Sequence, residues 1–418
     1  MMDQTVAVNK TVLENGLTVV SERIPAVRSI SMGIYVKTGS RHENKDNNGI
    51  AHLLEHMVFK GTKNFSAIQI ARSMENLGGS LNAYTSREIT VYYVHILDTH
   101  LELSVKILAE LALKPLLREN DLIKEKRVIQ EEISSVKDTP EEYIIDLFHE
   151  KLFPDHPLGR PILGTSDTLN GIDTNNLNEF WYNHYNPPNM VLSVAGNIDH
   201  QKLIKLVRKY FNSSNNRKIS SEYHFPGIRA EKGKSYDFSE PVNQTHICMG
   251  TDCFSFLDER KYDLIAINTY LGGGMSSRLF QLIREKRGLA YSVYSFLDFF
   301  MDSGVFGFYL GTEKSQAKKA IYLMMTEIKR VKTVPLSANM VKSLKEQLKG
   351  SYLLGLESTG RRMGRMAKNE IFFKRYIPDE EILDKINAIT AESLLQTAEQ
   401  VFTENALNTI TFIPNKRV

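Results

Sequence analysis

The segment His52-Leu-Leu-Glu55-His56 carries two histidines and a glutamate within five residues. On a helix, His52 and His56 lie one turn apart on the same side, so both imidazoles can reach one ion at about 2.0 to 2.1 Å. Glu55 borders the same site without having to ligate, which suits a general base that acts on water. The competing interpretation is a solvated helix face. The spacing favours a zinc site.

The order H-x-x-E-H is the inverzincin pattern, the reverse of the commoner H-E-x-x-H. A catalytic zinc needs a third protein ligand and an open position. The expected helix over residues 120–138 has one inward side, with spacings of three, four and seven, formed by Glu125, Val128, Ile129, Glu132 and Val136. Glu131 falls on the solvated side. Because carboxylates on an apolar face are costly to bury unpaired, we expect Glu132 to ligate the metal and Glu125 to support the site. A structural salt-bridge pair is the alternative.

The elements that position these residues begin with strands and a helix from about Ile50. A second helix follows, then one long strand over residues 80–97, several helices and a buried strand that closes the first half. After a polar linker the same order returns, without the histidines. The sequence therefore predicts an α+β protein with two copies of one unit, divided as domain 1–211, linker 212–235 and domain 236–418.

Composition narrows the function classes. The 418 residues include 52 basic and 49 acidic ones, and no basic stripe with interleaved aromatic residues suggests nucleic-acid binding. No apolar run approaches the roughly 20 residues that span a bilayer, and the N-terminus has no apolar signal core. Cys248 and Cys253, the only cysteines, are expected to be buried free thiols, which suggests a reducing compartment.

Five segments together resemble the pitrilysin (M16) family of zinc peptidases, in particular the mitochondrial processing peptidase and its bacterial relatives. They are "GIAHLLEHMVFKGT", "LNAYTSREITVYYV", "EKRVIQEEI", "HPLGRPILGT" and "GGGMSSRLFQLIREKRGLAYSVYSF", and they spread over nearly the whole chain. The resemblance implies one Zn²⁺ per chain, with His52, His56 and Glu132 as ligands, Glu55 as base and Glu125 in support. It also implies two homologous α/β-sandwich-like halves that face a central chamber.

The resemblance assigns substrate contacts to segments that would otherwise be ordinary structural elements. In relatives, the strand matching Asn82 and Ala83 binds an extended peptide at the edge of a sheet. The arginine and tyrosine matching Arg284 and Tyr291 approach the zinc from the other half and stabilise charge on the scissile carbonyl. Without the resemblance, a surface arginine and a packed tyrosine would be the better interpretation.

Two further segments bear on substrate and assembly. Gly272, Gly273 and Gly274 resemble the glycine-rich substrate loop of the processing peptidase, which there lies on the noncatalytic subunit. Because this chain carries that loop and the zinc motif, we expect a homodimer in which Arg284 and Tyr291 act in trans. Acidic residues on one expected helix face match positions that receive an arginine near the cleavage point, namely Glu142 and Asp146. A solvated acidic face is the alternative.

The expected function is that of a zinc-dependent metalloendopeptidase that cleaves short or unfolded, basic, presequence-like peptides. The alternative is a catalytically silent or partner-dependent structural subunit of the same family. Such subunits typically lack part of the zinc motif, whereas His52, Glu55, His56 and Glu132 are all present. A self-paired subunit resembles the bacterial relatives, so we expect a bacterial cytoplasmic location, with the mitochondrial matrix as the alternative.

Overall fold

The computed structural model describes residues 8–212 and 225–415, and its contacts divide the chain into two compact units. The first unit comprises Met1–Ile133, Arg160–Phe225 and Leu354–Tyr376, and the second comprises Ser134–Gly159, Pro226–Leu353 and Ile377–Val418. Residues 213–224 of the expected linker lie outside the described residues. The domain boundaries expected from the sequence stay a prediction.

The first unit is built on six strands and eight helices of the described chain. The strands are β1 (Val8–Val12), β2 (Thr18–Arg23), β3 (Ser29–Val36), β4 (Ser80–Thr85), β5 (Thr90–Leu97) and β6 (Met190–Gly196). The helices are α1 (Ile50–Val58), α2 (Ala67–Glu75), α3 (Leu101–Leu113), most of α4 (Glu119–Asp138), α6 (Ser166–Gly171), α7 (Thr174–His184), α8 (His200–Tyr210) and α12 (Thr359–Lys368).

The second unit has five strands and six helices within the described residues. The strands are β7 (Ser235–Glu240), β8 (Thr245–Cys253), β9 (Ala290–Phe299), β10 (Gly304–Thr312) and β11 (Asn408–Pro414). The helices are α5 (Pro140–Leu152), α9 (Lys261–Gly272), α10 (Ala317–Val331), nearly all of α11 (Ala338–Gly355), α13 (Asp379–Ala388) and α14 (Ala391–Val401).

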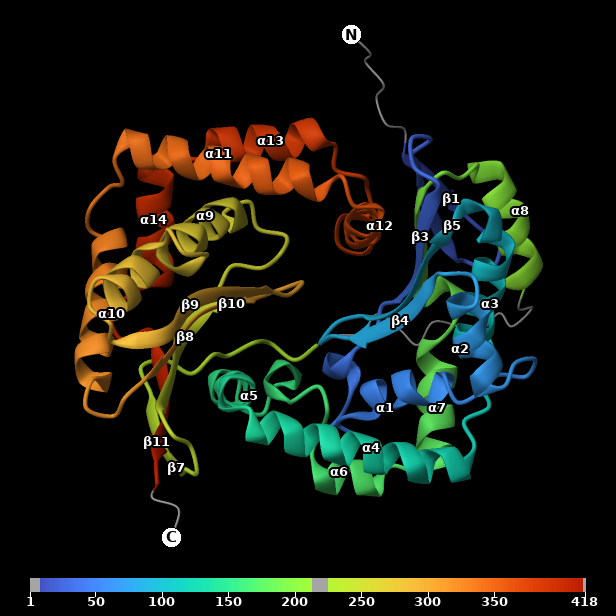
Figure 1. Cartoon of the computed structure of the whole chain (residues 1–418), viewed down its shortest axis with the longest axis horizontal. Coiled ribbons are helices and arrows are strands. Elements are labelled where there is room, and N and C mark those ends of the chain that lie inside the picture. The colour runs from blue at the N-terminus through green and yellow to red at the C-terminus, as the bar shows by residue number, and fades with distance from the viewer. Residues whose placement is uncertain (1–7, 213–224, 416–418) are drawn as a thin grey trace. The chain divides into compact units, whose positions relative to one another are not determined.

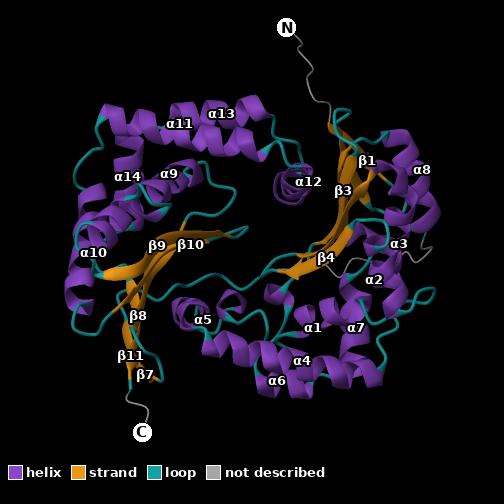
Figure 2. Cartoon of the chain, viewed as in Figure 1, coloured by secondary structure: helices purple, strands orange, loops and turns teal. Residues whose placement is uncertain are grey.

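The two sheets have the same topology, which confirms that the fold is α+β with one unit repeated. The first sheet has the order β1-β2-β6-β3-β5-β4 and the second β7-β11-β8-β10-β9. Figure 2 shows the strands of both sheets in orange. Without β1, the orders correspond strand for strand. In both sheets one matching pair is parallel, β2 with β6 and β7 with β11, and the other neighbours are antiparallel. The edge strand β4 therefore corresponds to the edge strand β9.

Each sheet is covered on both faces, which explains why its central strands are buried almost throughout. In β3, Met32 and Ile34 pack into the main core of the first unit, while Tyr35 packs with Met363 and Met366 of α12 on the other face. Ser31 reinforces the second contact through a hydrogen bond of its hydroxyl with that of Thr359, 2.8 Å. Figure 1 shows α12 against β3.

The helix on the second face of the other sheet is α5. Only one residue, Thr139, separates it from α4, yet its apolar side packs against β8 and β11 of the second unit. Ile144 and Phe148 are fully buried there beside Cys248 and Phe412. Helix α5 covers the second sheet although its segment directly follows residues of the first unit in sequence. Helix α12 covers the first sheet although residues of the second unit precede and follow its segment in sequence.

The expectation of one long strand over residues 80–97 is wrong. The chain turns between β4 and β5, where the backbone N–H of Ser86 donates to the carbonyl oxygen of Ile89 at 2.8 Å. The Ser86 hydroxyl donates to the same oxygen at 2.9 Å. This turn contains no glycine or proline, the usual sequence signals of a hairpin. Its consequence is that β4 lies at the edge of the sheet.

Two other expectations concern the cysteines and the membrane. Cys248 and Cys253 are free thiols, as expected, the first buried and the second half-buried. Across the described parts of the chain, no helix is both long enough and apolar enough to cross a bilayer.

Candidate metal centre

Helix α1 presents the histidines because its other sides are buried. Six of its nine residues are buried, namely Ile50, Ala51, Leu53, Leu54, Met57 and Val58. The helix starts after Gly49, whose φ of 97° is left-handed and whose missing Cβ would lie 2.6 Å from the carbonyl oxygen of Leu163. Glycine is therefore required at that turn. His52, Glu55 and His56 are left on one half-buried side.

A buried carboxylate, Glu43, holds the start of α1. It accepts hydrogen bonds from the backbone N–H groups of Gly49 at 2.8 Å and Ala51 at 2.9 Å. The side-chain amide of Asn48 donates to it at 2.7 Å. Burial raises the pKa of Glu43 to about 7, although these three donors lower it. Glu43 was not among the site residues expected from the sequence, because no local pattern links a loop carboxylate to a helix that begins seven residues later.

Helix α4 supplies the acidic side of the site. Its buried residues are Leu122, Glu125, Ile129 and Ile133. Glu131 is exposed, as expected, but the expectation that Val128 faces inward is wrong, since 44% of it is exposed. Val128 is one residue from Ile129 and so about 100° around the helix, outside the narrow buried stripe.

The described structure brings His52, His56 and Glu132 together. Nε2 of His52 lies 3.8 Å from Oε2 of Glu132, and Nε2 of His56 lies 3.6 Å from Oε1 of the same carboxylate. The potential ligand atoms of these three residues all lie within 4.8 Å of one another. On the far side of the His56 ring, Nδ1 lies 3.2 Å from Oε2 of Glu125. Nδ1 of His52 is buried and has no hydrogen-bond partner among the described residues.

These positions fit a zinc ion. Separations of 3.6 and 3.8 Å are too long for hydrogen bonds, but they approach the roughly 3.3 Å between ligand atoms in a tetrahedral zinc site. Burial, together with the neighbouring His56, lowers the pKa of His52 to about 3, so the ring is neutral, the form that ligates metals. Two imidazoles and a carboxylate are a common donor set of catalytic zinc. The Glu132 side chain is 40% exposed, which leaves room for solvent.

Glu55 lies beside this cluster, and its carboxylate is held from β4. The hydroxyl of Thr85, the last residue of β4, donates to Oε2 of Glu55. Burial raises the pKa of Glu55, and the Thr85 hydrogen bond opposes that shift. The alternation in β4 turns Leu81, Ala83 and Thr85 inward and leaves Asn82 exposed. That period-two pattern could have identified Thr85 as a residue on the side of α1, but it was not used.

Two of the expected substrate residues lie together in the second unit. Arg284 belongs to a π-helical turn, Phe280–Glu285, and its Nη1 donates to the carbonyl oxygen of Tyr291 at 2.9 Å. The guanidinium also lies 4.5 Å from the centre of the Tyr291 ring. Tyr291 is 76% exposed at the start of β9. The approach of these residues to His52, His56 and Glu132 stays a prediction.

The remaining expected residues have clear local structure but untested roles. Gly272 ends α9 close to β9, since a Cβ there would lie 2.2 Å from the backbone nitrogen of Ser295. A Cβ on Gly273 would also be too close to its neighbours, 2.7 Å from Cα of Thr269, whereas a Cβ on Gly274 would meet no atom within 4 Å. On α5, Glu142 is exposed and Asp146 is half-buried.

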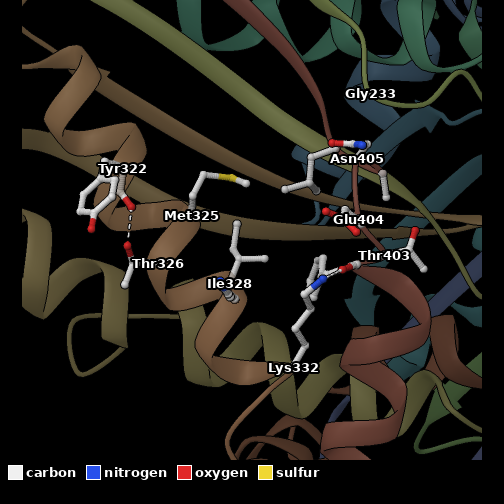
Figure 3. Close-up of a pocket in the computed structure, with 13 residues that line it drawn as sticks. Gly233, Tyr322, Met325, Thr326, Ile328, Lys332, Thr403, Glu404 and Asn405 are labelled. Atoms are coloured by element: carbon white, nitrogen blue, oxygen red, sulfur yellow. Dashed lines mark hydrogen bonds between the residues drawn. The ribbon is translucent and has the colours of Figure 1, made fainter.

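A pocket of about 840 Å³ lies elsewhere in the second unit, between α10 and the chain from Phe402 to Leu407 (Figure 3). Tyr322 and Met325 of α10 line one side, and Lys332 donates a hydrogen bond from its ammonium to the carbonyl oxygen of Phe402. No residue expected at the zinc or substrate sites lines this pocket.

Comparison with known proteins identifies the family. Residues 18–166 match the family model described as insulinase (peptidase family M16), and residues 171–348 match that of the peptidase M16 inactive domain. The chain belongs to peptidase family M16. The first match contains the histidine cluster, and the second covers most of the unit that lacks it.

The relatives of this M16 chain are bacterial zinc proteases by name. A protein of Bacillus subtilis, named uncharacterized zinc protease YmxG, is 40% identical over 94% of this chain and 95% of its own length. An uncharacterized zinc protease of Streptomyces coelicolor is 38% identical over 94% of this chain and 87% of its own. A solved protease structure from Helicobacter pylori shares the fold, with a TM-score of 0.90 at 24% identity over 98% of this chain and all of that one.

Substitution of Glu43 by glutamine should destabilise the first unit. The glutamine side chain must turn its NH₂ group against at least one of the three N–H donors, which leaves a buried donor unpaired at a cost of about 1–3 kcal/mol. Asp46→Asn, the same carboxylate-to-amide replacement at an exposed position of the same loop, should have little effect. Denaturant unfolding of the apoprotein measures both. Equal stability of the two variants would contradict the role of Glu43.

Proposed function

We propose that this M16 chain is a zinc-dependent metalloendopeptidase that cleaves short or unfolded, basic peptides. The observation that carries the proposal is the convergence of two Nε2 atoms on the Glu132 carboxylate, with Glu55 beside them. In this proposal His52, His56 and Glu132 hold one zinc ion. When bound, the ion supplies a Lewis acid that polarises the peptide carbonyl and lets water attack near neutral pH.

Glu55 acts as the general base and then as the general acid. It accepts a proton from the attacking water and delivers it to the leaving amine of the cleaved peptide. The Thr85 hydroxyl donates to Oε2 of Glu55, while Oε1 accepts no hydrogen bond from the described residues and is the oxygen proposed to move the proton. The raised pKa of Glu55 favours this double role, since a more basic carboxylate takes up the proton more readily.

The edge of β4 is the proposed binding site for the peptide backbone. Strand β4 pairs with β5 on one side and is the last strand of its sheet. An extended peptide can add to such an edge through main-chain hydrogen bonds that depend little on side chains. Binding along Asn82 and Ala83 would carry the peptide towards Thr85, the residue that contacts Glu55. Folded proteins have few free extended segments, which limits substrates to unfolded chains.

The second unit is proposed to contribute Arg284 and Tyr291, from the partner chain of a homodimer. The presence of the glycine-rich segment and the zinc motif in one chain supports this arrangement. The rival function is that of a silent or partner-dependent subunit, and the complete motif favours the enzyme. The names of the bacterial relatives and the free thiols support a bacterial cytoplasmic location, which cell fractionation can test.

Replacement of Glu55 by glutamine tests the core of the proposal. The variant should retain about one zinc per chain, because Glu55 is not a ligand. Its kcat/KM for an arginine-containing fluorogenic peptide should fall about 10²- to 10⁴-fold, because it cannot accept the proton. It should still bind the uncut peptide, and a backbone N-methylated version of that peptide should bind more weakly.

Zinc content, cleavage rate and fluorescence anisotropy give these three measurements. If the native chain holds no zinc and cuts nothing, the rival function is favoured. If the variant cuts as fast as the native chain, Glu55 is not the base.

Removal of the acidic pair on α5 tests the preference for basic peptides. The double variant Glu142→Gln, Asp146→Asn should lose about tenfold in kcat/KM for a peptide with arginine near the cleavage point, because charge-assisted hydrogen bonds disappear. Cleavage of a matched peptide with norleucine in place of arginine should not change. Glu150→Gln, at an exposed position of the same helix, is the control. Equal losses on both peptides would assign the pair a structural role.

Mixing of two inactive variants tests action in trans. Glu55→Gln and Arg284→Ala chains, each nearly inactive alone, should recover about a quarter of the native activity after co-refolding, because half of the dimers are mixed and each has one intact site. Gel filtration should show a dimer. Active Arg284→Ala chains would remove the residue from the mechanism, and recovery of no activity from the mixture would place Arg284 in the site of its own chain. An inactive monomer would favour the partner-dependent subunit.

A further inference from the structure

Within the described residues, Lys60 is the one lysine or arginine in contact with the carboxylates of the metal centre. Its ammonium lies 2.7 Å from Oε1 of Glu125. Among the described residues, no other lysine or arginine pairs with Glu55, Glu125 or Glu132. Nothing in the motif or in the family matches assigns a role to this residue, which lies just beyond the end of α1.

The contacts form a chain from Lys60 through Glu125 to Nδ1 of His56, the ring nitrogen opposite the one that faces Glu132. Glu125 is buried, with a side chain only 6% exposed, and its two oxygens have different partners. Oε1 contacts Lys60, and Oε2 contacts Nδ1 of His56 at 3.2 Å. These are the only polar partners of Glu125 within the parts of the chain that the structure describes. Each oxygen thus has one assigned partner.

The imidazole of His56 lies between two carboxylates, and its orientation decides whether it can ligate. Oε2 of Glu125 faces Nδ1, and Oε1 of Glu132 faces Nε2. A neutral imidazole carries one N–H, and a metal needs the other nitrogen. The ring ligates beside Glu132 only if the proton is on Nδ1, where it is donated to Glu125. An acceptor fixed at Nδ1 therefore keeps Nε2 open.

We propose that Lys60 is a positioning residue of the metal centre, which acts through Glu125 to fix the His56 ring with Nε2 free for the metal. A buried carboxylate without a countercharge is unfavourable and would move towards solvent or draw water into the site. Lys60 keeps it in place and leaves Oε2 as the acceptor. His52 differs, because its Nδ1 has no hydrogen-bond partner in the part of the chain that the structure describes, so His56 is the ring with the fixed orientation. The inference rests on the proposed zinc site.

The experiment measures the zinc affinity of the purified apoprotein by competition with a chromophoric chelator. Lys60→Met should weaken zinc binding about 10- to 100-fold, the usual effect of losing an outer contact of a ligating histidine. Lys60→Arg should bind within about threefold of the native chain, since it can still pair with Glu125. Lys63→Met is the matched control, because it removes the same charge from an exposed site three residues away.

A second comparison shows whether Lys60 acts through Glu125. Glu125→Gln alone should weaken zinc binding, and Lys60→Met added to it should cause no further loss. This double variant removes both charges, so it also provides the test if Lys60→Met alone fails to fold. Histidine-selective ¹⁵N NMR of the apoproteins should show Nδ1–H at His56 in the native chain and a mixture of tautomers in Lys60→Met.

Native affinity in Lys60→Met, or a further loss when it is added to Glu125→Gln, would overturn the inference. A native chain that binds no zinc would instead remove the proposed function. Zinc binding and Glu55-dependent cleavage with no effect at Lys60 would remove only the role of Lys60. The outcomes are therefore distinct.

Discussion

The burial of α1 is the constraint on which the metal centre depends. Because six of its nine residues are buried, the helix cannot rotate about its axis without exposing apolar surface. The remaining side carries the two histidines and Glu55. Helix α1 itself lies between β4 and α4 (Figure 1). Thr85 and Glu132 reach it from these two elements. Packing of the apolar side thus decides where the polar side points.

The same constraint sorts the carboxylates by their partners. Glu43 faces backbone N–H groups, Glu55 faces a hydroxyl, and Glu125 faces an ammonium and an imidazole. Glu132 differs from them. Within the described residues its nearest polar contacts are the two Nε2 atoms at 3.6 and 3.8 Å, too far for hydrogen bonds. It is half-exposed and is therefore the carboxylate best placed to complete a shell around an ion.

Local periodicity accounts for what could be predicted of the fold and the site. A spacing of four brought His52 and His56 to one side, and the face of α4 separated Glu132 from Glu131. The same reasoning failed at Val128. Spacings of three and four predict a wider buried side of α4 than the structure has, and Val128 lies outside it. It also missed the turn at Ser86, which contains no glycine and is held by hydrogen bonds from both the backbone N–H and the hydroxyl of Ser86.

Contacts between distant segments could not be predicted in this way. Glu43 and Lys60 both lie close to the motif in sequence. The path of a loop determines the partners of Glu43. The partner of Lys60 is Glu125 of α4, which lies 65 residues further along the chain. The repeat of one unit was visible from the order of elements. The placement of α5 on the second sheet and of α12 on the first could not be predicted, because the apolar side of a helix does not indicate which sheet it covers.

The repeat places different side chains beside equivalent edges of the two sheets. Strands β4 and β9 correspond, and each is the last strand of its sheet, so duplication left the same kind of edge in both units. Beside β4 the chain carries the histidines and Glu55. Beside β9 it carries Arg284, bonded to the carbonyl oxygen of Tyr291. The backbone arrangement is the same in the two units while the side chains next to the edge differ, and among the described residues the candidate metal ligands His52, His56 and Glu132 all belong to the first unit.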